Sequence, residues 1–173
     1  MEKTRFDGSL LDIMLEEEAW KNISRSEALT EAQLDKYRGK LDWEAVTSNP
    51  NMHWTPSLME RFKHSLDWGV LSATAGASLL VPEVIERFKD RWDWGALSEN
   101  SDLPLETVEM YPDRINWSAF IHRYCNSDQP FTRAFFEKWA DRIPAEEFKE
   151  STLWYDLVDE QEKELKRRLM LED

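Results

Sequence analysis

The chain has 173 residues, of which 22 are basic and 35 are acidic, and its formal net charge is −13. This acidity argues against ordinary nucleic-acid binding, because that binding draws its affinity from Lys and Arg. The single cysteine, Cys125, excludes a disulfide framework and an all-cysteine metal site. No run of about 18 apolar residues is present, and acidic residues lie near the start, so we expect neither a membrane span nor a signal peptide and predict a cytoplasmic protein.

In chain order, we expect one domain made of an N-terminal cap over residues 1–28, helical repeats over residues 29–145 and a C-terminal capping helix over residues 146–173. Closely spaced apolar residues indicate a helix in the first cap: Leu10, Leu11, Met14 and Leu15. Apolar residues also recur at helical spacing in the last: Trp154, Leu157, Val158, Leu165 and Leu169. Because terminal repeats have no next neighbour to cover them, we expect a polar outer face at both ends.

A tryptophan recurs along the chain at steps of 23, 25, 26 and 23 residues and anchors each unit: Trp20, Trp43, Trp68, Trp94 and Trp117. A sixth unit has Ala145 in this place. We number the positions of each unit from its anchor. Position +3 is always apolar, and position +4 is Ser or Thr in the first four units: Ser24, Thr47, Ser72 and Ser98. Residues that cap helices stand at position −1 in four units: Asp42, Asp67, Asp93 and Asn116. We therefore predict a short helix, helix A, with the anchor in its first turn.

A second helix, helix B, is predicted upstream of each anchor. Apolar residues recur at positions −14, −9, −6 and −2, a spacing that keeps them on one side of a helix about ten residues long. Threonines mark its start as N-caps: Thr30, Thr55 and Thr132. Pro56 and Pro82 stand at a first helical position.

The connection from helix A to helix B varies in length, whereas the connection from B to A is constant. Insertions in repeat proteins gather on one face, which is often the binding face. The longer connections supply candidate partner-binding residues: Asn51, Met52, His53, His122, Arg123 and Tyr124.

With units of about 24 residues, the pattern resembles the α-solenoid class that includes tetratricopeptide, HEAT and armadillo repeats. It is also similar to the short tryptophan-anchored repeats, D-W-x-x-L-S-x-N, of uncharacterised bacterial and giant-virus proteins; here that string runs from Asp93 to Asn100. The resemblance covers residues 29–145. It implies an all-α, right-handed α-solenoid of about five short helix pairs and carries no activity. A leucine-rich horseshoe is the rival interpretation, but no unit supplies its strand pattern.

The tryptophans are expected to join the units through packing rather than to stack on a ligand. Trp54 and Trp92 replace aliphatic residues, so among the tryptophans we expect partial exposure at these two, although we expect both to pack as well.

Charged residues recur next to each other on helix B. Position −8 is always acidic: Asp35, Glu60, Glu86, Glu109 and Glu137. A basic residue follows in four units: Lys36, Arg61, Arg87 and Lys138. Pairs with i,i+3 spacing are expected within single helices: Asp35–Arg38, Glu60–Lys63 and Glu86–Lys89. Two interpretations remain for this row of charges. It is either a solvent-exposed face whose acidic and basic residues pair with each other, or an acidic surface that binds a basic partner through Glu60, Glu86 and Glu109.

The case for catalysis is weak. The three histidines lie in different units without metal-ligand spacing, and the chain has no glycine-rich phosphate loop. His122 and Cys125 share one connection, but no third group can be placed beside them. We therefore expect no enzymatic activity, metal or cofactor.

Two functions remain. The first is a non-enzymatic protein-binding module or scaffold that uses one face of the solenoid. The alternative is an acidic inhibitor or immunity-type protein that neutralises a basic target. Both imply a protein partner, basic in the second case, and neither implies direct contact with nucleic acid or a membrane.

Overall fold

The computed structural model describes residues 8–124 and 130–171, and over these residues the chain is helical with no strand. The expected all-α fold of regularly spaced short helix pairs is confirmed. The chain divides into two compact parts, residues 1–71 and residues 72–173, and the boundary between them lies within α5 (Trp68–Thr74).

Two kinds of helix alternate along the chain. The helices that contain or begin at an anchor tryptophan, the A helices, are α1 (Gly8–Ser26), α3 (Trp43–Ser48), α5, α7 (Trp94–Glu99) and α9 (Trp117–His122). The B helices are α2 (Glu31–Lys36), α4 (Pro56–Phe62), α6 (Pro82–Arg87), α8 (Leu105–Met110) and α10 (Arg133–Trp139). The short 3₁₀ helix η1 (Phe148–Glu150) and the long α11 (Thr152–Leu171) follow.

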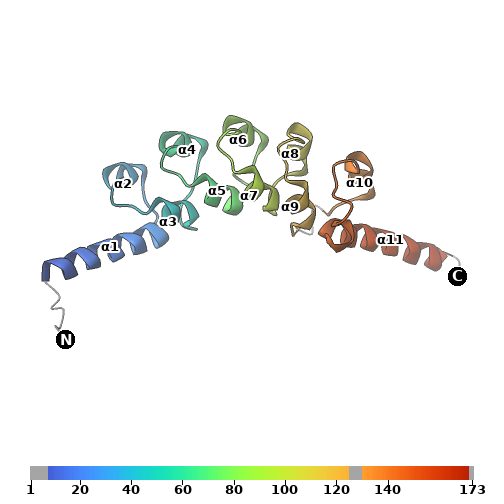
Figure 1. Ribbon diagram of the computed structural model, residues 1–173, viewed down its shortest axis with the longest axis horizontal. Coiled ribbons are helices and arrows are strands. Elements are labelled where there is room, and N and C mark those ends of the chain that lie inside the picture. The colour runs from blue at the N-terminus through green and yellow to red at the C-terminus, as the bar shows by residue number, and fades with distance from the viewer. Residues whose placement is uncertain (1–7, 125–129, 172–173) are drawn as a thin grey trace. The chain divides into compact units, whose positions relative to one another are not determined.

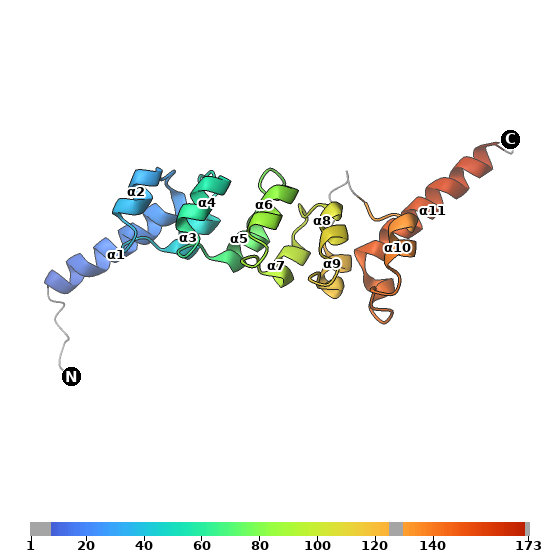
Figure 2. The ribbon, with the colours of Figure 1, turned by 90° about the horizontal axis from the view of Figure 1, so that it is seen from above.

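The A helices and the B helices form separate rows within each of these two parts. In residues 72–173, α6, α8 and α10 lie on one side and α7, α9 and α11 on the other (Figure 1). Within a row, α7 lies beside α9 and α6 beside α8 (Figure 2). Residues 1–71 show the same separation, with α2 and α4 on one side and α1 and α3 on the other.

Local capping explains where the short helices begin. The side chains of Asp42, Asp93 and Asn116 accept hydrogen bonds from backbone N–H groups in the first turn of their A helices. Thr30 forms a complete capping box with Gln33 at the start of α2. The B helices contain six or seven residues rather than about ten. After α2 the chain tightens into a turn, in which the N–H of Lys40 donates to the carbonyl of Tyr37 at 2.8 Å.

Each anchor from Trp43 onward closes the turn between helix B and helix A. Its indole N–H donates to the carbonyl five residues earlier, as from Trp94 to Lys89 at 2.8 Å and from Trp117 to Pro112 at 3.1 Å. This bond accounts for the constant length of the connection. The ring then packs against the aromatic residue at position −6 of the next unit, with centroid distances of 4.8–5.4 Å: Trp20–Tyr37, Trp43–Phe62, Trp94–Tyr111 and Trp117–Trp139. The tryptophans therefore join consecutive units.

The hydroxyl at position +4 links consecutive units through the backbone. The side chain of Ser98 donates to the carbonyl of Trp94 at 2.6 Å and accepts the N–H of Asn116 at 3.0 Å. The same acceptor role recurs in the other units: Ser24 to Asp42, Thr47 to Asp67 and Ser72 to Asp93. All four hydroxyl residues are buried. The D-W-x-x-L-S string thus combines a cap, a ring contact and a backbone link.

One expectation about exposure is wrong. Trp92 is 4% exposed, because position −2 faces the core in every unit and the neighbouring units fill it with Leu66 and Ile115. Trp54 is half-buried, as expected.

Candidate functional site

Two of the loop residues expected to contact a partner lie inside the fold. Met52 is 8% exposed and Arg123 is 4% exposed. The Arg123 guanidinium donates to the carbonyls of Asn100 at 3.1 Å and Leu103 at 2.8 Å, and its centre lies 4.1 Å from the ring centroid of Phe120. These contacts tie the end of α9 to the connection between α7 and α8, so Arg123 has a structural role, and Met52 is too buried to present its side chain to a partner.

The other loop candidates lie on the surface. Asn51 is exposed and donates from its amide to the carbonyl of Ser26 at 2.8 Å, and His53 is exposed. Tyr124 is 80% exposed. Cys125 lies outside the described residues.

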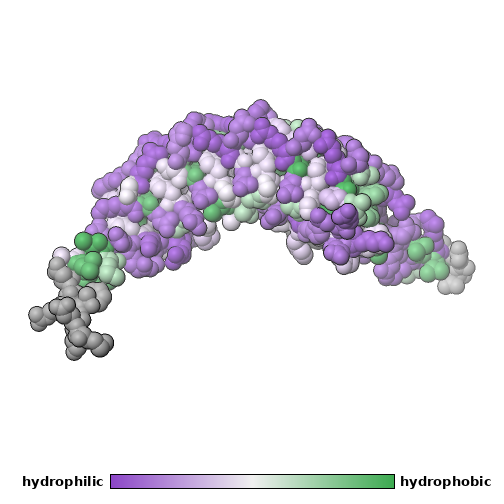
Figure 3. Space-filling view, viewed as in Figure 1, coloured by the Kyte–Doolittle hydropathy of each residue, from purple (hydrophilic) through white to green (hydrophobic). Residues whose placement is uncertain are grey.

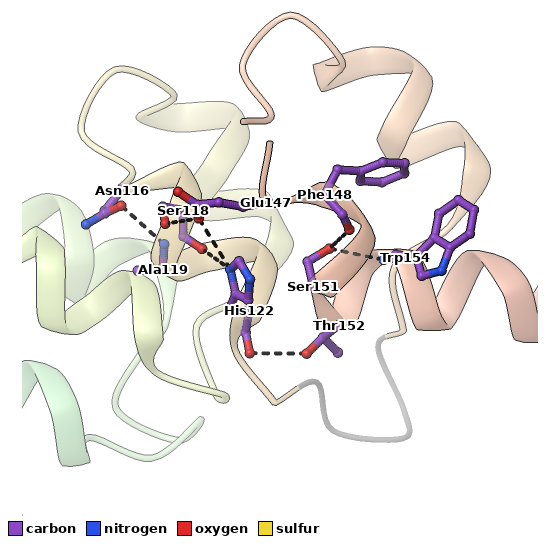
Figure 4. Close-up of polar contacts among 9 residues, drawn as sticks. All are labelled: Asn116, Ser118, Ala119, His122, Glu147, Phe148, Ser151, Thr152 and Trp154. Carbon is purple, nitrogen blue, oxygen red and sulfur yellow. Dashed lines mark hydrogen bonds and ion pairs between the residues drawn. The ribbon is translucent and has the colours of Figure 1, made fainter. Parts of the chain in front are cut away.

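His122 takes part in a small polar cluster at the end of α9 (Figure 4). Its Nδ1 lies 2.9 Å from the carbonyl of Ser118 and 3.8 Å from the carboxylate of Glu147. The hydroxyl of Ser118 donates to Glu147 rather than to the imidazole. A serine nucleophile needs the imidazole as its base, so this arrangement connects α9 to the turn before η1 and does not form a catalytic triad.

Four of the five acidic residues at position −8 of the B helices form ion pairs: Asp35, Glu60, Glu86 and Glu109. Glu60 and Glu86 bind Lys63 and Lys89 at 2.6 and 2.7 Å, at the predicted i,i+3 spacing. Glu109 instead binds Lys138 of the next unit at 2.6 Å. The expected pair between Asp35 and Arg38 does not form. Asp35 and Glu31 both bind Arg61 of the next unit, while the Nε of Arg38 donates to the hydroxyl of Ser65 at 2.9 Å.

An apolar groove of about 640 Å³ lies between α10, η1 and α11. Phe136 stacks on Phe148 with 5.0 Å between ring centroids, and Phe148 meets Trp154 edge to face at 5.4 Å. Figure 4 shows Phe148 on η1 beside Trp154 on α11. Leu157, Val158 and Leu165 of α11 continue the apolar lining, and a polar rim surrounds it: Arg133, Glu137, Gln161 and Glu162.

The repeat itself explains why this groove is apolar. Phe136 stands at position −9 and Phe148 at position +3 of the last unit. Upstream, position −9 is fully buried: Leu34, Met59, Ile85 and Val108. Position +3 is also buried in the four repeats upstream, namely Val46, Leu71, Leu97 and Phe120, whereas Ile23 in the N-terminal cap is half-buried. Phe136 and Phe148 are only half-buried, because in the part of the chain that the structure describes no further repeat covers them. The C-terminal face therefore differs from the polar cap that we expected.

A second apolar surface lies on the first half of α1. Five large side chains there are 47–59% exposed: Leu10, Leu11, Ile13, Met14 and Leu15. Figure 3 shows hydrophobic surface at this end of α1 and near the end of α11. The hollow beside α1 measures about 580 Å³, but charged side chains form much of its lining: Glu16, Glu17, Lys21, Lys40 and Asp42. The groove between α10, η1 and α11 is thus the more apolar of the two sites.

We also searched the described residues for a metal site and for a helix that could span a membrane. Within residues 8–124 and 130–171, no group of three or more His, Cys, Asp or Glu is placed to hold a metal ion. Across the same residues, no helix has both the length and the apolar character needed to cross a membrane. Comparisons of the chain with protein-family models, with curated proteins and with solved structures gave no match.

Proposed function

We propose that this chain is a non-enzymatic protein-binding module, and that the groove between α10, η1 and α11 receives the apolar face of a partner's helix. One observation carries the proposal. Phe136 and Phe148 occupy positions that are buried in the repeats upstream, yet here they line an open groove.

The form of the groove supports a helical ligand. Trp154, Val158 and Leu165 lie along one side of α11, and Phe136 faces them from α10. An apolar groove lined by side chains of two helices, with charged residues at its rim, suits helix-in-groove recognition. Burial of aromatic side chains stabilises such complexes, since apolar surface contributes about 25 cal/mol per Å² removed from water.

The second function, inhibition of a basic target, is favoured by the charge of the C-terminal segment. Residues 146–173 contain 10 acidic and 5 basic residues, so their net charge is −5. An acidic surface beside the groove would speed association with a basic protein and make it sensitive to salt.

The groove is tested with a partner captured on the immobilised chain, identified by mass spectrometry and purified. Val158→Glu and Leu165→Glu place a carboxylate on the apolar wall, and we expect each to weaken binding at least about tenfold in calorimetry. Leu10→Glu on α1 is the matched control, because Leu10 and Leu165 are both 48% exposed. Circular dichroism checks that the three variants are folded. Unchanged affinity in both groove variants, or loss of affinity only after Asn51→Ala and His53→Ala, would move the site away from the groove.

A further inference from the structure

Two series of ion pairs connect consecutive repeats, and both have the same direction. In the first, an acid at position −8 binds the base at position −7 of the following unit: Asp35 binds Arg61, and Glu109 binds Lys138 at 2.6 Å. In the second, the acid at position −4 binds the base at position −3 of the following unit: Glu16–Lys40 at 2.5 Å, Asp90–Arg114 at 2.8 Å and Asp113–Arg142 at 2.6 Å. In every such pair the carboxylate belongs to the earlier unit and the cation to the later one.

The last unit therefore ends each series with a carboxylate. Glu137 is its position −8 and Asp141 its position −4. Both side chains are exposed, and among the described residues neither forms an ion pair or hydrogen bond. Glu137 also lines the apolar groove. The equivalent acids of the unit before, Glu109 and Asp113, each bind a cation of the last unit. Glu137, in the groove lining, and Asp141, in the turn after α10, have no such cation.

We propose that the groove takes a short helix and following turn of a basic partner, whose two cations bind Glu137 and Asp141. This inference rests on the proposed function and names the chemistry of the partner. The required segment carries an apolar residue at the place of Phe136, a cation at the place of Lys138 and a second cation at the place of Arg142. No ring is required at the place of Trp139, because Ala145 stands where an anchor tryptophan would receive it.

The chain contains the template for this contact. The segment of α10 and its turn docks on the preceding unit through Lys138 to Glu109 and Arg142 to Asp113. The ring of Trp139 packs on Trp117 with 5.3 Å between centroids. A partner segment of the same chemistry, moved one repeat further along, would meet Glu137 and Asp141 with its cations and Phe136 and Phe148 with its apolar side chains.

A second copy of the chain fits this place poorly. Each copy has a net charge of −13, so two copies repel each other. In addition, each B helix of the chain comes directly after an A helix, so a B helix of a second copy would bring its own A helix with it. The position beside α9 that this A helix would need is already occupied by α11. The occupant is therefore a helix that arrives without a preceding A helix.

The inference is tested by titrating the full-length, ¹⁵N-labelled chain with a capped synthetic peptide of residues 131–143. The indole signal of Trp154 reports on the groove, and NMR detects the millimolar binding expected of a short peptide that must fold as it binds. The control is the same peptide with Lys138→Glu and Arg142→Glu, which have similar helix propensity. We expect saturable binding of the native peptide and roughly tenfold weaker binding of the reversed one at low salt, with a smaller difference at high salt.

A charge exchange separates this inference from the proposed function. In a chain with Glu137→Lys and Asp141→Lys, the reversed peptide should bind more tightly than the native one. If the preference does not change, or if neither peptide binds, the two carboxylates do not select the partner, while the groove remains open to the test with Val158→Glu. If light scattering shows a dimer that Leu165→Glu dissociates, the groove belongs to a second copy and the inference is wrong.

Discussion

Asn100 provides the sharpest test of how the repeats are held together. Its side-chain amide donates to the carbonyls of Ser72 and Ala75, both at 2.9 Å, and its side-chain oxygen accepts the N–H of Asp102 at 2.8 Å. Asn100 is 6% exposed, and both carbonyl contacts are buried. One side chain thus satisfies three backbone groups: a carbonyl in the last turn of α5, a carbonyl in the connection after α5 and an N–H in the connection after α7.

The substitution Asn100→Ala removes all three bonds and leaves two buried carbonyls without their donor. A buried polar group that loses its partner costs about 1–3 kcal/mol, and each carbonyl retains some access to other donors, so we expect a loss of about 3 kcal/mol in the free energy of unfolding. For a chain of this size this corresponds to a decrease in Tm of about 6–12 °C. Asn100→Asp should be worse at neutral pH, because a carboxylate would direct an acceptor at two carbonyl oxygens.

Urea unfolding followed by circular dichroism measures these differences. Asn51→Ala is the matched control, because its amide also donates to a backbone carbonyl, that of Ser26, but on the exposed surface. The control should lose less than about 1 kcal/mol. If Asn100→Ala is no less stable than Asn51→Ala, the buried amide does not hold the connections together.

Two further predictions concern the links between units. Ser98→Ala should lower the free energy of unfolding by about 1–2 kcal/mol, because the N–H of Asn116 loses its acceptor. Ser98→Thr, which keeps the hydroxyl, should retain most of that stability in the same urea assay. Lys40→Met should raise the pKa of Glu16, because the hydrogen bond from Lys40 is the main cause that holds this pKa below its ordinary 4.5. The stability that the pair contributes is therefore present above pH 4.5 and is lost as the pH falls through the lower, folded pKa; carboxyl titration by NMR of both proteins would refute this if their Glu16 pKa values agreed.

The sequence was sufficient for features that depend on neighbouring residues. Capping by Asp93 and Thr30 is such a case, because the bonded N–H lies within the next three residues and the residue types alone identify it. The fixed spacing between helix B and its anchor also indicated a packed turn. The structure adds the cause, which is the indole bond to a carbonyl five residues earlier.

Features that depend on the following unit could not be predicted in this way. The sequence marks Ser98 as recurrent but does not show that its partner is the N–H of Asn116. Arg123 was assigned to a binding loop because its connection is long and polar, yet its guanidinium lies over Phe120 and donates to two carbonyls. The side chain of a polar residue in a connection can face the solvent or can bond to buried backbone groups, and tertiary packing decides which of these occurs.

The direction of the ion pairs gives the net charge a structural meaning. Residues 29–145 contain 18 acidic and 13 basic residues, a net charge of −5 over most of the chain, whereas the 28 residues from 146 to 173 alone also carry −5. Because the pairs of these two series take their acid from the earlier unit and their base from the later one, a row of such repeats neutralises itself internally and leaves acids in its last unit. Glu137 and Asp141 are those acids, and Glu137 lines the groove where we propose that a partner helix packs. The charge and the apolar surface therefore meet at one place, and a partner that satisfies both must be basic and amphipathic.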